Sequence, residues 1–225
     1  YNLDIERFAQ DTLLSLTSAE LLLLFYRSLE SIRLLDPTCG AGAFLFASLA
    51  VLTPLYEACL VCMQTMATSV EVRAVFEDIL AQVALAPTLR SFVLNSILRL
   101  NLYGVDLMEE AIELCKMRFT LLLLGETAKT ANAGSIFLPS LAPHLCTGNA
   151  LVGFAFDKQA LLPQMTVQPL LPFSAEKLDR VLAEKDYGIV TPSLFAAWRA
   201  RHQPFHWGIA FPEVMAQGGF SVIVG

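Results

Sequence analysis

The stretch that decides the fold reads Leu34-Leu35-Asp36-Pro37-Thr38-Cys39-Gly40-Ala41-Gly42-Ala43-Phe44. A short apolar strand, 32–35, runs into an acidic residue, a turn with two glycines follows, and a long apolar helix begins at about Ala43. Glycines let a ligand approach the backbone closely, and the start of a helix offers N–H groups that have no partner within the helix. This arrangement predicts a cradle for a nucleotide-like cofactor.

Asp36 narrows the kind of cofactor. A carboxylate at the end of the strand repels a phosphate group but accepts hydrogen bonds from an ammonium group. The G-x-G-x-x-G spacing of dinucleotide binders is also absent, since no glycine stands three residues after Gly42. Both features favour a cofactor with an amino-acid tail, such as S-adenosylmethionine (SAM), over a dinucleotide.

The composition of the 225-residue chain is unusually apolar. Hydrophobic residues make up 55% and charged residues 16%, against about 45–50% and about 25% in ordinary soluble domains. The surplus indicates either a large interior or apolar surface that meets other parts of a larger protein. The net charge of −6 argues against a DNA-gripping surface on this segment, because such surfaces are basic.

A membrane span is the competing interpretation of the uncharged run from Pro37 to Tyr56, which has about the length of a spanning helix. The run opens with a proline and two glycines, and Pro54 lies near its end. We therefore expect a helix of about 10–15 residues buried in the core. No signal peptide is visible at the start, and a membrane-associated protein is the interpretation we rank lowest.

The five cysteines form an odd number without a disulfide framework, which indicates a reducing cytoplasm. Cys59 and Cys62 make a lone C-x-x-C in a helical stretch, and we favour core packing over metal binding for them. His202 and His206 have a spacing that suits zinc on a helix, but Pro204 interrupts the helix and no third ligand is evident. We expect no metal site.

Helical and strand patterns alternate along the chain. Helices are expected within 3–15, 21–29, 42–64, 71–85, 88–99, 108–124, 175–185, 192–201 and 205–215, the second behind a capping box from Thr17 to Glu20. Strands are expected at 32–35, 102–105, 145–150 and 220–224, the last one buried, with loops at 126–143 and 157–175. This order predicts an α/β fold with a parallel sheet.

Two further strand ends carry polar side chains. Asp106 ends the second strand, where an acid in a doubly wound sheet can bind both ribose hydroxyls. Its alternative role is to cap the next helix, but beside the glycine turn we favour the ribose. Asn149 follows the third strand and offers an amide to an adenine edge, although by itself an ordinary asparagine turn explains it better.

Residues 36–44 resemble motif I of the amino-group DNA methyltransferases, usually written DPxCGSGxF, with Ala41 where serine is more common. Further blocks follow in the family's order at 44–60, 101–111, 148–153, 204–207 and 218–220. The combination resembles the large adenine-specific methylases of type IIG restriction–modification enzymes and of BREX-type phage-defence systems. The resemblance covers nearly the whole chain.

This resemblance implies a class I SAM-dependent methyltransferase fold: a Rossmann-like parallel sheet with helices on both faces, incomplete here and with helical insertions. It divides the chain into a helical lead-in (1–31), a cofactor-binding core (32–156) and a helical insertion leading into the strand before the catalytic motif (157–225). The whole stretch 1–225 would then be a partial SAM-binding domain.

The resemblance also implies the cofactor contacts. Asp36 and the backbone of 38–42 would hold the methionine end of SAM, and Asp106 its ribose. Leu107 would lie against the adenine, and Asn149, where many relatives carry Asp, would read the adenine amino group. The implied cofactor-binding residues are Asp36, Pro37, Thr38, Cys39, Gly40, Ala41, Gly42, Phe44, Asp106, Leu107, Asn149 and Ala150.

In this family an Asn-Pro-Pro-Tyr or Asn-Pro-Pro-Trp motif follows the strand that ends in Val-Ile-Val-Gly. Its asparagine and a proline carbonyl accept hydrogen bonds from the target amine, and its aromatic ring stacks on the flipped base. We therefore expect the catalytic residues directly after Gly225 and none within 1–225. The stretch alone should not methylate.

The implied partner is double-stranded DNA, held mostly by parts outside this segment, with room for a nuclease domain or subunit. We also expect the segment to self-associate through exposed apolar faces and a strand edge. A non-catalytic SAM- or nucleotide-binding module, used for regulation or assembly, remains the alternative function.

Overall fold

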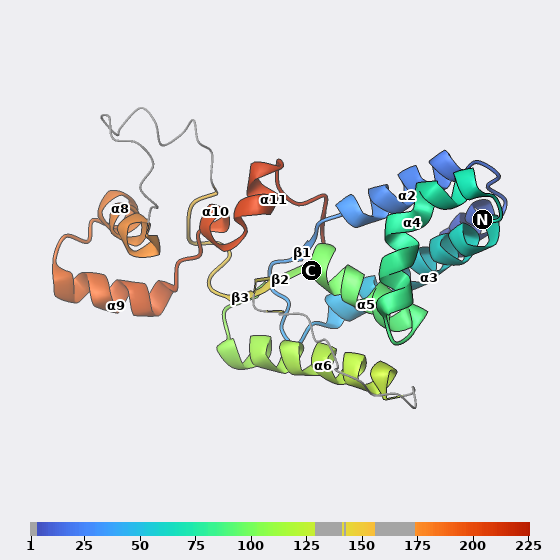
Figure 1. Ribbon diagram of the computed structural model, residues 1–225. Helices are drawn as coiled ribbons and strands as arrows, with labels where there is room; N and C mark the ends of the chain where they lie inside the picture. Colours follow the sequence, from blue (N-terminus) through green and yellow to red (C-terminus); the bar gives the residue numbers. More distant parts are fainter. Residues whose placement is uncertain (1–3, 129–140, 142, 156–173) are drawn as a thin grey trace.

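The computed structural model describes residues 4–128, 141, 143–155 and 174–225 (Figure 1). The loops expected at 126–143 and 157–175 lie mostly outside these residues. The elements are α1 (Ile5–Leu14), α2 (Ala19–Ser31), β1 (Leu34–Asp36), α3 (Ala43–Met66), α4 (Val70–Leu85), α5 (Leu89–Leu100), β2 (Leu102–Asp106), α6 (Glu109–Thr127), β3 (Leu145–Thr147), α8 (Ala175–Tyr187), α9 (Pro192–His202), α10 (Trp207–Ala210), α11 (Pro212–Ala216) and β4 (Val222–Ile223).

The described strands form one parallel sheet in the order β3-β2-β1-β4. Leu34 of β1 lies opposite Leu102 of β2 on one side and Val222 of β4 on the other. Asp106 at the end of β2 lies opposite Thr147 of β3. The predicted α/β class with a parallel sheet is therefore confirmed.

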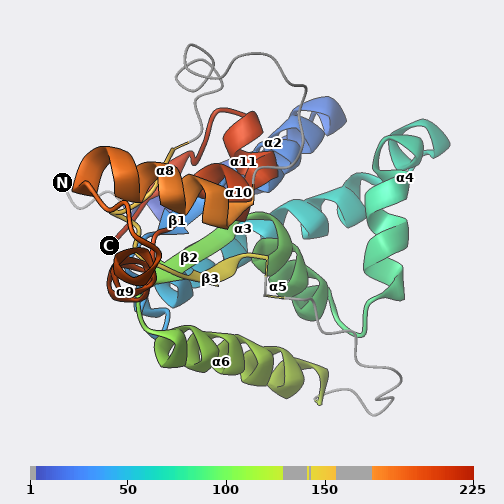
Figure 2. The same ribbon diagram turned by 90° about the vertical axis from the view of Figure 1, so that its left-hand side faces the viewer.

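Helices cover both faces of the sheet, because successive strand residues point to opposite sides. Leu34 and Leu102 join the larger core, which also takes in buried residues of α2 to α6. Figures 1 and 2 show α6 beneath the sheet and the short helices α10 and α11 above it. The second, smaller core consists of Leu35, Tyr103, Val105, Phe205, Phe211 and Val214.

Asn101 joins the helical layer to the sheet. It lies fully buried between α5 and β2, and its Nδ2 donates to the carbonyl oxygens of Leu29 at 2.8 Å and Ile32 at 2.9 Å. Its Oδ1 accepts a hydrogen bond from the hydroxyl of Tyr56 in α3 at 3.0 Å. Through its Nδ2 and its Oδ1, one side-chain amide thus fixes the positions of α2 and α3 relative to the start of β2.

The helix α3 runs for 24 residues from Ala43 to Met66 with Pro54 inside it. The helix predicted at 42–64 is therefore confirmed within two residues, whereas the expectation that Pro54 limits it to 10–15 residues was wrong. Proline removes one backbone donor and usually kinks a helix, but buried residues on both sides of it, such as Leu49 and Cys59, keep the helix in the larger core. Cys59 and Cys62 both lie there as free thiols.

Among the described residues α3 is the one helix long and apolar enough to cross a membrane. The mean hydropathy of its most apolar 18-residue window is 1.8, and 39% of that window is buried. The helices α4 and α5 pass the same test only as one joined span, and they are bent by 105° relative to each other. This is weak evidence for a span, because the buried core helix of a soluble protein has the same length and composition.

Three further local predictions need correction. Ser18, not Thr17, caps α2, since its side chain accepts from the N–H of Leu21. The helix expected at 205–215 is two short helices that meet at Phe211, because Pro212 starts a new one. The last strand is an exposed edge rather than a buried strand: it pairs with β1 alone among the described strands, and the exposed fraction of Ile223 is 66%.

Candidate cofactor site

The carboxyl ends of the parallel strands place the predicted polar residues along one edge of the sheet. Asp36 ends β1, Asp106 ends β2, and Thr147 ends β3 two residues before Asn149. The register pairs Asp36 with Gly104 and Asp106 with Thr147. Ligands of open α/β sheets bind at this edge, where the strand order reverses, and here the order reverses between β1 and β4.

Asp36 is a fully buried carboxylate with one unpaired oxygen. Its Oδ1 accepts from the N–H of Thr38 at 3.1 Å, whereas its buried Oδ2 has no hydrogen-bond partner among the described residues. Burial raises the pKa of Asp36; the hydrogen bond from Thr38 opposes that rise, and the charge of Asp106 adds to it. A buried acceptor without a donor is costly, so this oxygen is a place where a ligand donor would gain binding energy.

The glycine loop, residues 37–42, has a conformation that needs both of its glycines. Gly40 has φ 51° and Gly42 has φ 86°, in the left-handed region that other residues avoid. A Cβ on Gly42 would lie 2.6 Å from Sγ of Cys115 in α6, whereas a Cβ on Gly40 would meet nothing within 4 Å. The loop is thus packed from below at Gly42 and open at Gly40.

A thiol of the glycine loop, that of Cys39, pairs with the thiol of Cys115 in α6. Cys39 and Cys115 are both buried and free, and a hydrogen bond between the two thiols raises the pKa of Cys39 and lowers that of Cys115. The Sγ of Cys39 would also lie 2.9 Å from a Cβ on Gly104. Small residues therefore let the loop, β2 and α6 approach one another closely.

Asp106 connects two loops of the site. Its Oδ2 accepts from the N–H of Gly40 at 2.8 Å, and its Oδ1 accepts from the N–H of Met108 at 2.9 Å. The second bond closes a turn before α6, whose N-cap is Met108 and which is capped by no described side chain, so the alternative role of Asp106 as the helix cap was wrong. Each carboxylate oxygen can accept more than one hydrogen bond, so the predicted role toward ribose hydroxyls stays a prediction.

The helix α3 begins directly after the glycine loop with Gly42 at its N-cap and, in the part of the chain that the structure describes, no side chain that caps it. Phe44 in its first turn is 54% exposed, and Leu107 after β2 is 49% exposed. Both apolar side chains are thus accessible to a ligand at this edge.

Asn149 lies in the predicted turn but uses its amide oxygen there, because Oδ1 accepts from the N–H of Leu151 at 3.1 Å. This is the ordinary asparagine turn, and the predicted contact with adenine stays untested. The structure adds a neighbour that the sequence did not reveal. The N–H of Asn149 donates to the carbonyl oxygen of Gln203 at 2.8 Å, in a parallel bridge with Pro204.

The segments 149–154 and 203–207, here called the paired segments, continue this contact. The N–H of Phe205 donates to the oxygen of Val152 at 2.7 Å, and the N–H of Trp207 donates to that of Phe154 at 3.2 Å. The pairing is so close that a Cβ on Gly153 would lie 1.8 Å from the carbonyl oxygen of Phe205. It connects the turn after β3 to the segment before α10.

A buried polar group anchors the paired segments to α8 and α9. His206 lies 2.9 Å from Oδ1 of Asp179 through Nε2, and its Nδ1 accepts from the N–H of Phe154 at 3.2 Å. Arg199 donates to Oδ2 of Asp179 at 2.7 Å. His202 instead bonds the oxygen of Trp198 through Nδ1 at 2.9 Å. The two histidines therefore serve packing, and the described residues contain no cluster that could hold a metal.

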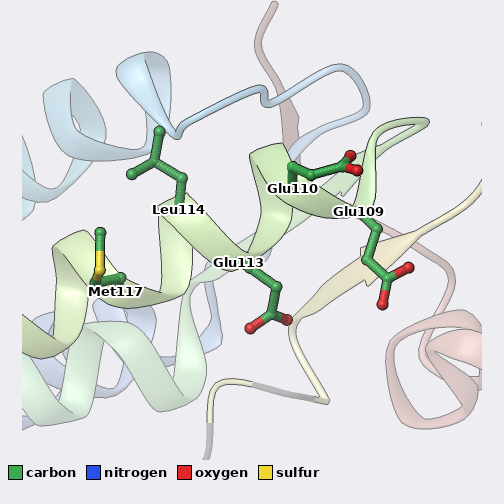
Figure 3. A pocket seen from close by; sticks show the side chains of 5 residues that line it. All are labelled: Glu109, Glu110, Glu113, Leu114 and Met117. Carbon is green, nitrogen blue, oxygen red and sulfur yellow. The ribbon is translucent and has the colours of Figure 1, made fainter.

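A shallow hollow opens on the outer side of α6 (Figure 3). Figure 3 shows Glu109 and Glu113 on one stripe of the helix and Glu110 with the apolar side chains on the next. The described residues that line it all belong to α6: Glu109, Glu110, Glu113, Leu114 and Met117. This acidic hollow contains none of the residues predicted to bind the cofactor.

Sequence reasoning missed two residues of α6 that touch the glycine loop. Cys115 packs under Gly42, and Arg118 donates to the carbonyl oxygen of Ala41. Their spacing of three residues places them on the same face of a helix, and the helix after β2 lies next to the loop after β1. The sequence therefore contained the signal for both contacts.

A family model for the Eco57I restriction-modification methylase matches residues 100–225, more than half of the chain. The chain belongs to the Eco57I restriction-modification methylase family. The match contains β2 with Asp106, the turn with Asn149 and the paired segments, whereas the glycine loop lies before it.

A curated protein of Methanocaldococcus jannaschii, named "Putative type II restriction enzyme and methyltransferase", is 28% identical to the methylase chain over 131 residues. The match covers 58% of this chain and 9% of that protein, so the chain spans a small part of its relative's length. No solved structure matches.

Proposed function

We propose that this restriction-modification methylase chain is the SAM-binding part of a DNA adenine-N6 methyltransferase. The observation that carries the proposal is the buried, unpartnered Oδ2 of Asp36 beside the glycine loop. The membership in a methylase family names the reaction class, and the site has the acceptor that the α-ammonium group of SAM needs.

The sheet supports a class I, Rossmann-like fold. Its order β3-β2-β1-β4 is the first part of the doubly wound order 3-2-1-4-5-6, in which ligands bind outside the strand ends at the point of reversal. That point lies between β1 and β4, where a Cβ on Gly225 would lie 3.5 Å from Oδ1 of Asp36. The position of Asp36 beside this point supports the proposal that it binds SAM.

The residues at this edge fit SAM. Asp36 would accept from its ammonium group, the open side at Gly40 would admit its tail, and Asp106 would accept from its ribose hydroxyls. Leu107 and Asn149 would border its adenine. When bound, SAM supplies the methyl group. The residues of this chain would orient SAM and would place the negative charge of Asp36 beside its ammonium group.

Adenine as the target base rests on the likeness of the sequence blocks at 36–44, 148–153 and 218–220 to adenine-specific methylases. DNA would contact parts other than this acidic segment, whose net charge is −6. A nuclease partner is proposed from the name of the Methanocaldococcus jannaschii relative, and a cytoplasmic location from the cysteines, which form no disulfide among the described residues.

Calorimetric titration with SAM tests the cofactor. We expect saturable binding, and we expect Asp36→Asn to weaken it by at least about tenfold through loss of a charged acceptor. Asp106→Asn should weaken it as well. Asp11→Asn is the matched control, since Asp11 is an exposed acid of α1, and it should bind like the wild type. Absence of SAM binding by the folded wild type would refute the proposal.

Nucleoside analysis tests the target base. The protein expressed from its whole reading frame is incubated with methyl-labelled SAM and DNA, and the DNA is digested to nucleosides. Label in N6-methyladenine is expected, and label in a methylated cytosine would overturn adenine specificity. SAM binding without any methylated nucleoside would favour the alternative, a non-catalytic SAM-binding module.

A further inference from the structure

We propose that Arg118 is a positioning residue for the cofactor: from the middle of α6 it sets the orientation of the Ala41–Gly42 peptide in the glycine loop. The proposal rests on the proposed function, because it treats this loop as the one that holds SAM. Arg118 is outside the motif I residues and was not among the predicted contacts.

The Ala41–Gly42 peptide is held from both sides. Its carbonyl oxygen accepts a hydrogen bond from Nη1 of Arg118, and its N–H, on Gly42, donates to the oxygen of Cys39 at 2.7 Å. Turning this peptide over changes ψ of Ala41 and φ of Gly42, and Gly42 has a left-handed φ of 86°. Glycine imposes little preference on its own backbone, so the hydrogen bond from Arg118 adds an anchor from outside the loop.

The guanidinium of Arg118 is itself held in place. It lies over the ring of Phe46, 4.4 Å from the centroid, and Phe46 stacks on Phe119 with a centroid distance of 4.3 Å. Cation–π contact favours this placement. Because Phe46 belongs to the start of α3, Arg118 joins α6, the loop and the next helix at one point.

The common alternative for a helical arginine does not fit. A cation interacts with the helix dipole in the last turn, but Arg118 is the tenth of the 19 residues of α6. No described acidic side chain forms an ion pair with it, in contrast to Arg180, which pairs with Glu176. Its described polar contact is the loop carbonyl.

Orientation matters because an unanchored peptide exposes either its oxygen or its N–H to the ligand. With Ala41 O turned toward Arg118, the loop keeps this acceptor away from the edge where Asp36 and Asp106 already place negative charge. Arg118→Gln removes the charge and the ring contact. The loop then samples both peptide orientations, and only one of them matches SAM.

The experiment compares Arg118→Gln and Arg118→Lys with the wild type by two readouts. The first is the Kd for SAM from calorimetry. The second is hydrogen exchange, without ligand, of peptides that cover residues 38–46. Arg180→Gln is the matched control, because Arg180 also lies over a ring, that of Phe195, at 4.6 Å, and has an exposed ion pair.

We expect Arg118→Gln to raise the Kd for SAM about tenfold, the loss of one charged hydrogen bond, and to speed exchange in 38–46. Arg118→Lys should recover part of both effects, and Arg180→Gln should change neither. Unchanged Kd and unchanged exchange in Arg118→Gln would overturn the proposal. A wild type that does not bind SAM would refute the proposed function instead, and the exchange readout alone then decides whether Arg118 anchors the loop.

Discussion

The glycine loop and the paired segments lie near the same edge of the sheet but are held there by different means. Neighbouring residues shape the loop: an acid before it, two glycines inside it and an apolar helix after it. The paired segments join chain positions about fifty residues apart through backbone hydrogen bonds and a buried Asp179–His206 contact. The comparison teaches that local sequence shapes the glycine loop, which Asp106 and α6 then hold in place, whereas the paired segments depend on distant contacts throughout.

The strongest test of the paired segments is Gly153→Ala. An added Cβ would lie 1.8 Å from the oxygen of Phe205, and backbone cannot give way without breaking the pairing. We expect a loss of more than about 3 kcal/mol in the free energy of unfolding, measured by urea denaturation. Gly125→Ala is the control. Gly125 lies within α6, and a Cβ there would have no described heavy atom within 4 Å, so this substitution should stabilise the protein by about 0.5–1 kcal/mol. Equal stability of the two variants would contradict the close pairing.

The corresponding change in the glycine loop is Gly42→Ala. Its Cβ would lie 2.6 Å from Sγ of Cys115 at a left-handed φ, which should cost about 2–3 kcal/mol by the same measurement. Adding Cys115→Ala should recover the steric part and leave about 1 kcal/mol of backbone strain. Gly40→Ala, in open space, should cost only that strain. A double variant no more stable than Gly42→Ala would show that the thiol is not the obstacle.

The anchor of the paired segments is tested by Asp179→Asn. The amide loses the charge that accepts from Arg199 at 2.7 Å and contacts His206 at 2.9 Å, so we expect a loss of about 2 kcal/mol. Glu176→Gln removes an exposed ion pair on the same helix and should cost less than about 0.5 kcal/mol. Thermal melts of both variants check this order of stability losses. A similar loss in the two variants would contradict it.

The smallest effect concerns pH and the glycine loop. Burial raises the pKa of Asp36 above 3.8, so the folded chain holds this proton more tightly than the unfolded chain. Stability from this group therefore falls as pH rises from the ordinary carboxyl pKa through the raised one. Asp36→Asn should make the ligand-free protein more stable than wild type at pH 7, with a difference that shrinks toward pH 3.8. Urea midpoints across this range check it, and a difference independent of pH would contradict it.

These regions also differ in how well the sequence predicts them. The acid, the glycines and the apolar helix start identify the loop, because each acts through its own backbone or its neighbours. Asp106 was placed correctly at the end of β2, since strand ends can be read from an apolar run. The α/β class follows from the same alternation.

The missed features all depend on partners far along the chain. Gly153 looks like an ordinary turn glycine until Phe205 lies against it, and Arg118 looks like a surface cation until Ala41 O lies beside it. Pro54 favours a helix end, but α3 continues past it because apolar residues before and after the proline are buried in the larger core. The apolar strand 220–224 seemed buried, yet its place at the sheet edge leaves Ile223 exposed. Periodicity shows which residues avoid water, not which neighbour covers them.

The length of α3 has a mechanical consequence. A helix of 24 residues is about 36 Å long, and one end carries the glycine loop while the other packs against α1 and α4. A tilt of about 5° about the loop end would move the far end by about 3 Å, the rise of two helical residues. Pro54 stands at the middle, where a missing backbone hydrogen bond concentrates bending. Pro54 is therefore the position at which α3 bends most easily between the glycine loop and the end that packs against α1.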